Sequence, residues 1–472
     1  MVYPLFPVLE ISVEFKPVSR STSRRVIDIV RAFGLGERDE YYTVFKDFRL
    51  EWDDPSVIFV TGESGGGKTT LLKAFKSLYG SKAVDMDDVA VTDDEVLCES
   101  IGRDTREALY FLSMAGLGEA MLFVRSYSEL SAGQKYRYRL AKTFYKAVSE
   151  NYEAIIVDEF CSLLDRLTAR VVAYTAQKIA RKYGKTFISA SSHNDIIEDL
   201  NPDIIIVKPF LKPPKVEKRR FESKPFSLLK DVEIVEGRKK DYMKLEIFHY
   251  KGFTPVYVAN VYKAVYHDDI VGVIVYSYAS LSNRMRRRVF GSDLRDLAKS
   301  KKLLAISRVV VHPSWRGVGL GARLVADTLT RTDADIVEAM AAMAIYNPFF
   351  EKAGMKLGGI RRVEYDRDMK IFEDTLSSYG FKPENRVSWR LVYDWLRSLP
   401  EDKLIELQKR LSRVRVYRCF GRTLYYKRCL AKGILPLHTL ASYIHSYPLP
   451  GMEYAYYYWV RPGVEIWLRG FR

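Results

Sequence analysis

Residues 57–70 read Val57-Ile-Phe-Val-Thr-Gly62-Glu-Ser-Gly-Gly-Gly67-Lys68-Thr69-Thr70. The apolar run at 57–60 predicts a strand buried on both faces, and the LLKAFKSLYG that follows this stretch predicts a helix. Glycines between a strand and a helix let backbone N–H groups turn inward around phosphate oxygens. Lys68 is expected to reach the outer phosphates and Thr69 to hold Mg²⁺. The predicted phosphate-binding residues are Gly62, Glu63, Ser64, Gly65, Gly66, Gly67, Lys68, Thr69 and Thr70.

Three further apolar runs, at 154–157, 186–190 and 203–207, show the same pattern of two-sided burial. Such runs are typical of a parallel sheet in an α/β domain. The run at 154–157 is followed directly by Asp158 and Glu159. We expect Asp158 to hold the metal and Glu159 to orient or deprotonate an attacking water. The alternative is that both carboxylates merely cap a surface strand, and the wholly apolar strand before them disfavours it.

A second anion-binding helix start is predicted where Leu130-Ser131-Ala-Gly133-Gln134 opens the basic helix KYRYRLAKTFYKA. A Ser and a Gly at a helix N-terminus leave backbone N–H groups facing outward. This segment resembles the LSGGQ signature of the ATP-binding-cassette (ABC) family. The resemblance implies that two copies form a homodimer around two ATP molecules, with Ser131, Gly133 and Gln134 of one copy facing the phosphates held by Lys68 of the other.

The same resemblance extends along the chain. Residues 158–165 look like the family's Walker B motif and D-loop, and His193 occupies the place of its switch histidine. The family's Q-loop glutamine is missing, because no Gln precedes Gln134, and Glu95 or Glu99 is a candidate substitute. Tyr41 or Tyr42 is expected either to stack on adenine or to lie in the core. The interval between Lys68 and Ser131 is shorter than in transporter members, and no apolar run is long enough to span a bilayer. We therefore expect a cytoplasmic, non-transport cassette.

A second glycine turn lies in LLAISRVVVHPSWRGVGLGARLVADTL at 303–329. It resembles the R/Q-x-x-G-x-G/A motif of the GNAT acyltransferase superfamily, and ADIVEAMAAMAIYNPFFEKAGM at 334–355 resembles that superfamily's next strand and helix. The alternative is a nucleotide-binding or merely structural turn. The resemblance implies that the turn cradles the pyrophosphate of acetyl-CoA. The coenzyme-binding residues it implies are Val310, Val311, Arg316, Gly317, Val318, Gly319, Leu320, Gly321, Asn347 and Phe350.

Acyl transfer to an amine needs a base for the amine and an acid for the departing thiolate. In many GNAT members a tyrosine is the acid, but Phe350 stands at that position. Tyr346, four residues earlier, is our replacement candidate because it would lie one helical turn away. The candidate bases are His312, Glu338 and the His249–Tyr250 pair. Each of these residues is alternatively an ordinary core or strand residue.

The net charge of +16 is unevenly distributed, with −4 over residues 1–200 and +20 over 201–472. The basic part indicates an anionic partner such as nucleic acid, or alternatively a solvated basic surface. Aromatic and basic residues alternate at 414–429, a pattern suited to phosphates and stacked bases. The tyrosine-rich run at 453–461 is equally consistent with a strand that packs on its own domain. The predicted nucleic-acid contacts are Arg284, Arg286, Arg287, Arg288, Arg418, Arg422, Lys427 and Arg428.

The predicted fold class is α/β: a P-loop ABC-ATPase domain, then a GNAT acyltransferase domain and a basic α+β C-terminal extension. SRSTSRR at 19–25 leads into a short predicted helix, and further helices are expected near 386–412. Four cysteines in 472 residues indicate buried thiols rather than disulfides or a zinc site. The predicted parts are an N-terminal segment at 1–40, the ATPase at 41–208, a basic proline-rich linker at 209–226, the acyltransferase at 227–370 and a basic tyrosine-rich region at 371–472.

Together the two domains resemble archaeal fusions of an ABC ATPase with a predicted acetyltransferase. The sequence favours an ATP-hydrolysing N-acyltransferase that uses Mg²⁺, ATP and acetyl-CoA and acts on an amine of nucleic acid. One alternative is an ATP-regulated acetyltransferase for protein or polyamine amines. Another is a structural DNA-binding ATPase whose second domain binds CoA without chemistry.

Overall fold

The computed structural model describes residues 7–15, 22–34, 42–249, 255, 257–414, 423–447, 449 and 451–465. The chain separates into two compact units. The first comprises 1–253, 260–274 and 308–328, and the second comprises 254–259, 275–307 and 329–472. These units do not follow the predicted boundaries, because strands β11 (Asp269–Tyr278) and β12 (Leu303–Val311) each contribute residues to both. Each unit is described by itself below.

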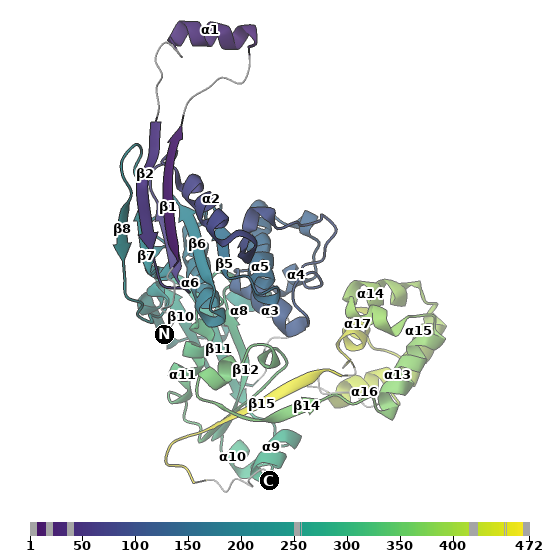
Figure 1. Ribbon diagram of the computed structural model, residues 1–472. Helices are drawn as coiled ribbons and strands as arrows, with labels where there is room; N and C mark the ends of the chain where they lie inside the picture. Colours follow the sequence, from purple (N-terminus) through teal and green to yellow (C-terminus); the bar gives the residue numbers. More distant parts are fainter. Residues whose placement is uncertain are drawn as a thin grey trace. The chain divides into compact units, whose positions relative to one another are not determined.

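In the first unit the described residues form a six-stranded sheet in the order β4–β5–β6–β3–β7–β8. Figure 1 labels four of these strands, β5, β6, β7 and β8. The pairs from β4 through β7 are parallel. The four predicted apolar runs are confirmed as β3, β5, β6 and β7. The strands are β3 (Val57–Thr61), β4 (Ala83–Asp85), β5 (Ala154–Val157), β6 (Thr186–Ser191), β7 (Ile204–Val207) and β8 (Lys215–Lys218).

Both faces of this sheet are covered by apolar side chains, which is why its central strands read as continuous apolar runs. Along β3, Val57 and Phe59 belong to one core cluster, whereas Ile58 and Val60 belong to another. Successive side chains of a strand point to opposite faces, so the two clusters lie on opposite sides of the sheet. The helices of this unit include α2 (Lys68–Tyr79), α3 (Thr105–Met114), α4 (Ala120–Phe123), α5 (Ala132–Ser149), α6 (Arg166–Tyr183), α7 (Ile197–Leu200) and α8 (Lys239–Leu245).

Two segments predicted to stand outside the ATPase domain pair with or pack onto its strands. In the predicted linker, β8 pairs antiparallel with β7 from Lys218 to Lys215. In the predicted N-terminal segment, β1 (Val8–Phe15) pairs with β2 (Tyr42–Glu51), and Leu9 joins the same core cluster as Ile58. The short helix predicted after 19–25 is confirmed as α1 (Arg24–Phe33), whose N-cap is Ser23.

A seven-stranded sheet follows, in the order β14–β15–β13–β12–β11–β10–β9. Strand β12 runs parallel to β13, whereas β15 runs antiparallel to both β13 and β14. The tyrosine-rich run therefore forms an internal strand, and Tyr456 and Tyr457 are buried in it. Residues 453–460 of the predicted C-terminal region therefore belong to this sheet. The remaining strands are β9 (Val232–Glu236), β10 (Val258–Tyr266), β13 (Ile336–Ala341), β14 (Lys356–Arg362) and β15 (Glu453–Val460).

The helices predicted near 386–412 are confirmed as part of a bundle with its own core in the second unit (Figure 1). The bundle contains α13 (Arg367–Ser378), α14 (Trp389–Ser398), α15 (Glu401–Leu411), α16 (Thr423–Lys432) and α17 (Leu437–Ser446). Three shorter helices of the second unit are α9 (Arg284–Phe290), α10 (Arg295–Lys299) and α12 (Phe349–Lys352). Helix α11 (Leu320–Leu329) lies almost wholly in the first unit. Among the described residues, none of the helices has the length and apolar composition needed to cross a bilayer.

The cysteines agree with the expectation of separate thiols. Cys161 and Cys429 are buried, Cys98 is half-buried, and all three are free. Cys419 lies outside the described residues. Within the described ranges, no group of three or more His, Cys, Asp or Glu side chains is arranged to hold a metal ion.

Candidate nucleotide site and second glycine turn

The first glycine turn runs from the end of β3 at Thr61 to the start of α2 at Lys68. Its backbone is left-handed at Gly67, where φ is 102°. A Cβ atom on Gly62 would lie 2.0 Å from the Lys208 carbonyl oxygen, so no side chain fits there. The predicted residues 62–70 therefore form one continuous strand-to-helix loop, whose backbone N–H groups are suited to phosphate oxygens.

Lys68 lies inside this loop. Its Nζ donates to the carbonyl oxygens of Gly62, at 2.8 Å, and Glu63, at 3.0 Å, and the residue is 7% exposed. Thr69 Oγ1 donates to Asp158 Oδ2 at 2.6 Å. A hydroxyl and a carboxylate that already meet are oxygen ligands of the kind that Mg²⁺ prefers. The residues present thus fit a magnesium-bound triphosphate.

Glu159 is exposed beside this pair. Its backbone has φ of 46°, and Ser162 Oγ donates to its Oε2 at 2.8 Å, which aims the carboxylate. The next residue, Phe160, donates its N–H to the Ala190 carbonyl at the end of β6. His193 follows β6 and is also exposed. Glu159 and His193, the two predicted catalytic residues of the ATPase, are therefore both exposed just after a strand, where a ligand can reach them.

The cassette-like signature lies at the start of α5. Ser131 is the N-cap, and its side chain and that of Gln134 form a reciprocal capping box: Gln134 N–H donates to Ser131 Oγ at 3.4 Å, and Ser131 N–H donates to Gln134 Oε1 at 3.0 Å. This arrangement satisfies two N–H groups of the helix start and fixes its direction. Ser131 is exposed and Gly133 half-buried, so the turn can meet a ligand brought by another molecule. Asp165, in the predicted D-loop, caps α6 by accepting from Thr168 N–H at 2.9 Å.

Several residues around this site were not predicted. Lys208 is buried, and its Nζ donates to the carbonyls of Pro209 and Lys212 within the segment after β7. Its backbone N–H donates to the Thr61 carbonyl at 2.7 Å, which holds this segment next to the start of the glycine loop. Asn194 Oδ1 accepts from Thr61 Oγ1 at 2.5 Å and joins the loop after β6 to the end of β3. A lysine and an asparagine in loops carry no spacing signal, so only the fold reveals them.

Of the four candidates for the Q-loop substitute and the adenine-stacking tyrosine, three lie among the described residues. Glu95 accepts from Lys142 Nζ at 2.8 Å and from the Tyr138 hydroxyl, so its carboxylate is already paired with α5. Glu99 is exposed, and Tyr42, at the start of β2, is 38% exposed. Tyr41 lies outside the described residues.

Part of this chain is similar in sequence to proteins described as translocation ATP-binding proteins. Leukotoxin translocation ATP-binding protein LktB of a Pasteurella haemolytica-like species (strain 5943B) is 28% identical over 201 residues, covering 35% of this chain and 27% of that protein. LktB of Mannheimia haemolytica is 27% identical over the same length. The chain spans about a quarter of the length of these curated relatives.

Solved cassettes are also similar to this chain. MJ0796, described as a bacterial ABC transporter cassette and solved as a dimer, is 18% identical, with 45% of this chain and all of that one covered at a TM-score of 0.33. MJ1267, solved in its ADP conformation, is 16% identical, with 38% of this chain and 86% of that one covered at a TM-score of 0.30. No family model matches the chain.

The second glycine turn, also in the first unit, lies between β12 and α11. Gly317 and Gly319 have φ of 85° and 98°, and a Cβ on Gly319 would meet no described atom within 4 Å. Gly319 is exposed, so the backbone at Gly319 is accessible to a diphosphate, whereas Gly321 is half-buried. Val310, Val318 and Leu320 are buried and Val311 is half-buried, so these side chains support the turn and only their backbone can reach a ligand.

Arg316 was expected to bind the coenzyme, but its guanidinium is engaged elsewhere. Nε donates to the Val311 carbonyl at 3.0 Å, Nη2 donates to the Phe248 carbonyl at 3.3 Å, and Nη1 donates to the Gly118 carbonyl. Burial lowers the pKa of this guanidinium from its ordinary value, and the charge of Glu119 opposes the shift. The prediction is corrected because Arg316 holds the turn in place instead of facing a diphosphate.

His312, a candidate base, caps the short helix after β12. Its Nδ1 accepts from Ser314 N–H at 3.3 Å, and its ring packs edge-on against Phe248. Burial first, and the charge of Arg316 second, lower the pKa of His312 below 6.5. The neutral ring that results at pH 7 is the form that accepts a proton. His249 is half-buried, and Tyr250 lies outside the described residues.

In the second unit, the predicted helical relation between Tyr346 and Phe350 is wrong. Helix α12 begins only at Phe349, because Pro348 stands at its N-cap and Tyr346 belongs to the preceding turn. Tyr346 is 37% exposed, whereas Phe350 is buried against Tyr457 with ring centroids 5.3 Å apart. The backbone of Asn347 caps this turn, with its N–H donating to the Met343 carbonyl. Tyr346 therefore remains a candidate acid on exposure, whereas Phe350 supports the fold.

Glu338 is not placed as a free catalytic base. It is 5% exposed, and its carboxylate accepts from Arg286 Nη2 at 2.6 Å, Arg286 Nε at 3.0 Å and the Tyr456 hydroxyl at 2.8 Å. Burial and the adjacent carboxylate raise the pKa of Tyr456. Two predictions are corrected together, because Arg286, which was predicted to face nucleic acid, is fully buried in this cluster.

Of the other predicted nucleic-acid contacts, five are exposed on helices α9 and α16, and two lie outside the described residues. Arg284, Arg287 and Arg288 are exposed on α9, although Arg287 also pairs with Asp293 at 2.8 Å. Lys427 and Arg428 are exposed on α16 beside Tyr425, which is 58% exposed. Arg418 and Arg422 lie outside the described residues.

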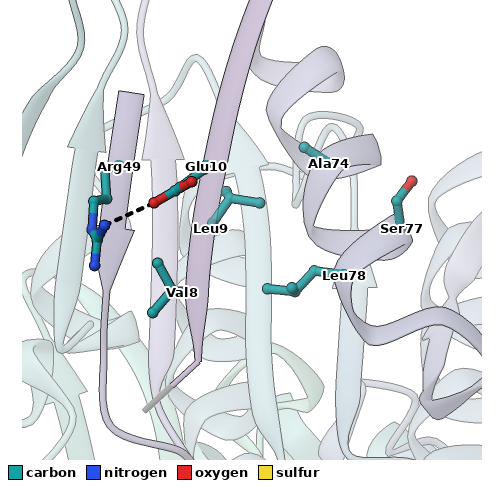
Figure 2. Close-up of a pocket in the computed structure, with 7 residues that line it drawn as sticks. All are labelled: Val8, Leu9, Glu10, Arg49, Ala74, Ser77 and Leu78. Carbon is teal, nitrogen blue, oxygen red and sulfur yellow. Dashed lines mark hydrogen bonds and ion pairs between the residues drawn. The ribbon is translucent and has the colours of Figure 1, made fainter. Parts of the chain in front are cut away.

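A hollow of about 820 Å³ lies between the β1–β2 pair and α2 (Figure 2). Apolar side chains and the exposed Arg49–Glu10 ion pair line it. Helix α2 contributes Ala74, Ser77 and Leu78, which lie beyond its glycine-loop end. None of the predicted site residues is among the seven that line this hollow.

Proposed function

We propose that this chain is an ATP-hydrolysing, acyl-CoA-dependent N-acyltransferase that uses acetyl-CoA and acts on an amine presented by nucleic acid. The observation that carries the proposal is the presence of two separate glycine turns, each between a strand and a helix. One holds Lys68 beside the Thr69–Asp158 pair, and the other leaves open space at Gly319. Both have the form expected of a cradle for linked phosphates.

For the ATPase, residues 62–70 would bind the triphosphate, while Thr69 and Asp158 would hold Mg²⁺, which neutralises phosphate charge when bound. Glu159, aimed by Ser162, would take a proton from the attacking water. His193 would contact the outer phosphate from the end of β6. Ser131, Gly133 and Gln134 of a second copy would close the site, so ATP binding would bring two chains together. The exposure of Ser131 and its ordered cap support this arrangement.

For acyl transfer, the turn at 317–321 would hold the diphosphate of acetyl-CoA through its backbone N–H groups. The acceptor amine, freed of a proton, would attack the thioester carbonyl carbon, and the carbon–sulfur bond would break. The departing thiolate would take up a proton as CoA. His312, neutral at pH 7, is our candidate base, and Tyr346 is our candidate acid.

The acceptor is inferred from charge. Residues 201–472 carry +20, and exposed Lys427 and Arg428 lie next to an exposed tyrosine on α16. Phosphate neutralisation by such residues makes binding fall steeply with salt, because condensed counterions are released. Tyrosine rings beside them suit unpaired bases.

The test is incubation of the purified chain with radiolabelled acetyl-CoA and, separately, total RNA, DNA, total protein and spermidine. Label in RNA or DNA is the expected result. Label in protein or spermidine alone would replace the proposed acceptor with the corresponding amine. CoA binding without label in any fraction would overturn the transferase and favour a structural DNA-binding ATPase. Lys68→Ala should abolish ATP turnover and leave CoA binding intact.

A further inference from the structure

Arg137 ties the signature turn to a neighbouring glycine segment within the first unit. It lies on α5, one turn after Gly133, and its Nε donates to the Gly133 carbonyl at 3.3 Å. Its Nη1 donates to the Gly116 carbonyl at 2.7 Å. A Cβ atom on Gly116 would lie 3.3 Å from Arg137 Cδ, so the guanidinium stem fills the space beside this glycine. One side chain thus connects the start of α5 to the segment after α3.

The same glycine segment touches the second turn two residues later. Gly118 accepts a hydrogen bond from Arg316, and a Cβ on Gly118 would approach Arg316 Cδ to 3.0 Å. Gly317 also lies close to the ATPase domain, because a Cβ there would be 3.1 Å from Thr175 Cγ2 on α6. The second glycine turn therefore packs closely on the domain that carries the signature.

Both arginines are half-buried and are held by backbone carbonyls. Burial lowers the pKa of Arg137 as it does that of Arg316. A buried charged donor that loses its acceptors carries a large desolvation penalty, so neither bond is readily given up. A shift of the start of α5 therefore requires Gly116 to move with Arg137, and a shift of Gly118 requires Arg316 to follow.

We propose that Arg137 and Arg316 are positioning residues that link the signature turn, through residues 116–118, to the second glycine turn. Contact of the signature with ATP in the closed dimer then changes the affinity of the second turn for the diphosphate of CoA. This inference rests on the proposed function and adds to it a defined route between the two ligands. Coupling of binding affinities is reciprocal, so CoA changes ATP affinity by the same factor.

The test uses the full chain with Glu159→Gln, which is expected to hold ATP without hydrolysis. Calorimetric titration gives the Kd of CoA with and without MgATP, and the Kd of ATP with and without CoA. We expect both ratios to differ from one by the same factor, at least about fivefold. In the Glu159→Gln chain, adding Arg137→Met or Arg316→Met should bring both Kd ratios to one. Adding Arg139→Met, on the same helix but bonded to the Met86 carbonyl, should leave them unchanged.

The outcomes separate the two proposals. CoA that binds with the same Kd in the presence and absence of ATP overturns the coupling and leaves the proposed function standing. If the Kd ratios are unchanged in the Arg137→Met and Arg316→Met variants, the proposed route through residues 116–118 is overturned. Absence of CoA binding overturns the proposed function and the inference together. If Arg137→Met fails to fold, Arg137→Lys keeps the charge but cannot reach both carbonyls, so a partly reduced ratio is expected from it.

Discussion

At the scale of single residues, Glu159 is predicted to supply the base for ATP hydrolysis. It is exposed, and Ser162 aims its carboxylate. Glu159→Gln keeps the shape but cannot accept a proton, so turnover should fall about 10²- to 10⁴-fold while ATP still binds. Phosphate release and equilibrium ATP binding measure the two effects. Ser162→Ala should reduce turnover less, and full activity of Glu159→Gln would contradict the assignment.

His312 makes the stability of the chain depend on pH. Its pKa in the folded chain is lowered below 6.5, so the unfolded chain binds more protons in that range. The stabilisation is therefore present above about pH 6.5 and is lost as the pH falls through the folded pKa. Denaturant unfolding between pH 7.5 and 5 should show this loss. His312→Gln should flatten the profile, and an unchanged pH dependence in that variant would count against the buried neutral ring.

The Arg286–Glu338 pair is predicted to be structural. Arg286→Met would leave the buried Glu338 carboxylate without its main partner and should cost about 3–5 kcal/mol of unfolding free energy. The double change Arg286→Met with Glu338→Leu should cost much less, since no buried charge remains. Arg284→Ala, on an exposed part of the same helix, should change stability by less than about 0.5 kcal/mol. Equal losses in all three variants would contradict a buried pair.

At the scale of secondary-structure elements, β15 is the strand whose loss should be felt most in the second unit. Ala455 pairs with Ala341 on one side and Ile360 on the other. Proline lacks a backbone N–H and does not fit an internal strand, so Ala455→Pro should destabilise the unit by about 3 kcal/mol or more. Ala455→Gly, which keeps the N–H, is the control. Equal resistance of both variants to limited proteolysis would argue against an internal position.

The elements that sequence predicts best are those whose burial is visible in a short run of residues. Strands β3, β5, β6 and β7 are mostly apolar at their centres because side chains cover both faces of their sheet. Strand β8 could not be predicted, since KVEK is exposed and its pairing with β7 is what makes it a strand. For β15, the partner strands lie about a hundred residues earlier, so the sequence left its role open.

The residues of the candidate site also fall into two groups, those that sequence neighbours reveal and those whose role depends on distant partners. The loop from Gly62 to Thr70, the Asp158–Glu159 pair and the cap at Ser131 each depend on neighbours in sequence, and spacing reveals them. The roles of Arg316 and Glu338 depend on distant partners, the Gly118 carbonyl and Arg286. Arg137 is an intermediate case, because its spacing of four residues from Gly133 on a helix predicts a contact that the sequence analysis did not use.

At the scale of the whole molecule, the basic residues of 201–472, such as Lys427 and Arg428, are predicted to bind nucleic acid, whereas the glycine loop at 62–70 is predicted to bind ATP. Binding of RNA or DNA should weaken steeply between about 50 and 200 mM salt, because phosphate contacts release counterions. Replacing Lys427 and Arg428 together with Ala should lower the slope of log affinity against log salt by about two, with ATP turnover unchanged. Filter binding at several salt concentrations measures this slope. A slope near zero in the parent chain would favour a small amine as acceptor.

Binding of ATP by the glycine loop at 62–70, between two copies of the chain, underlies both proposals. Sedimentation velocity of the Glu159→Gln chain with MgATP tests this most directly. We predict a species of twice the 54.5 kDa chain mass that reverts to single chains without nucleotide, and none in the Lys68→Ala chain. A chain that stays at 54.5 kDa under saturating MgATP, or an ATP-dependent dimer that persists in Lys68→Ala, would contradict it.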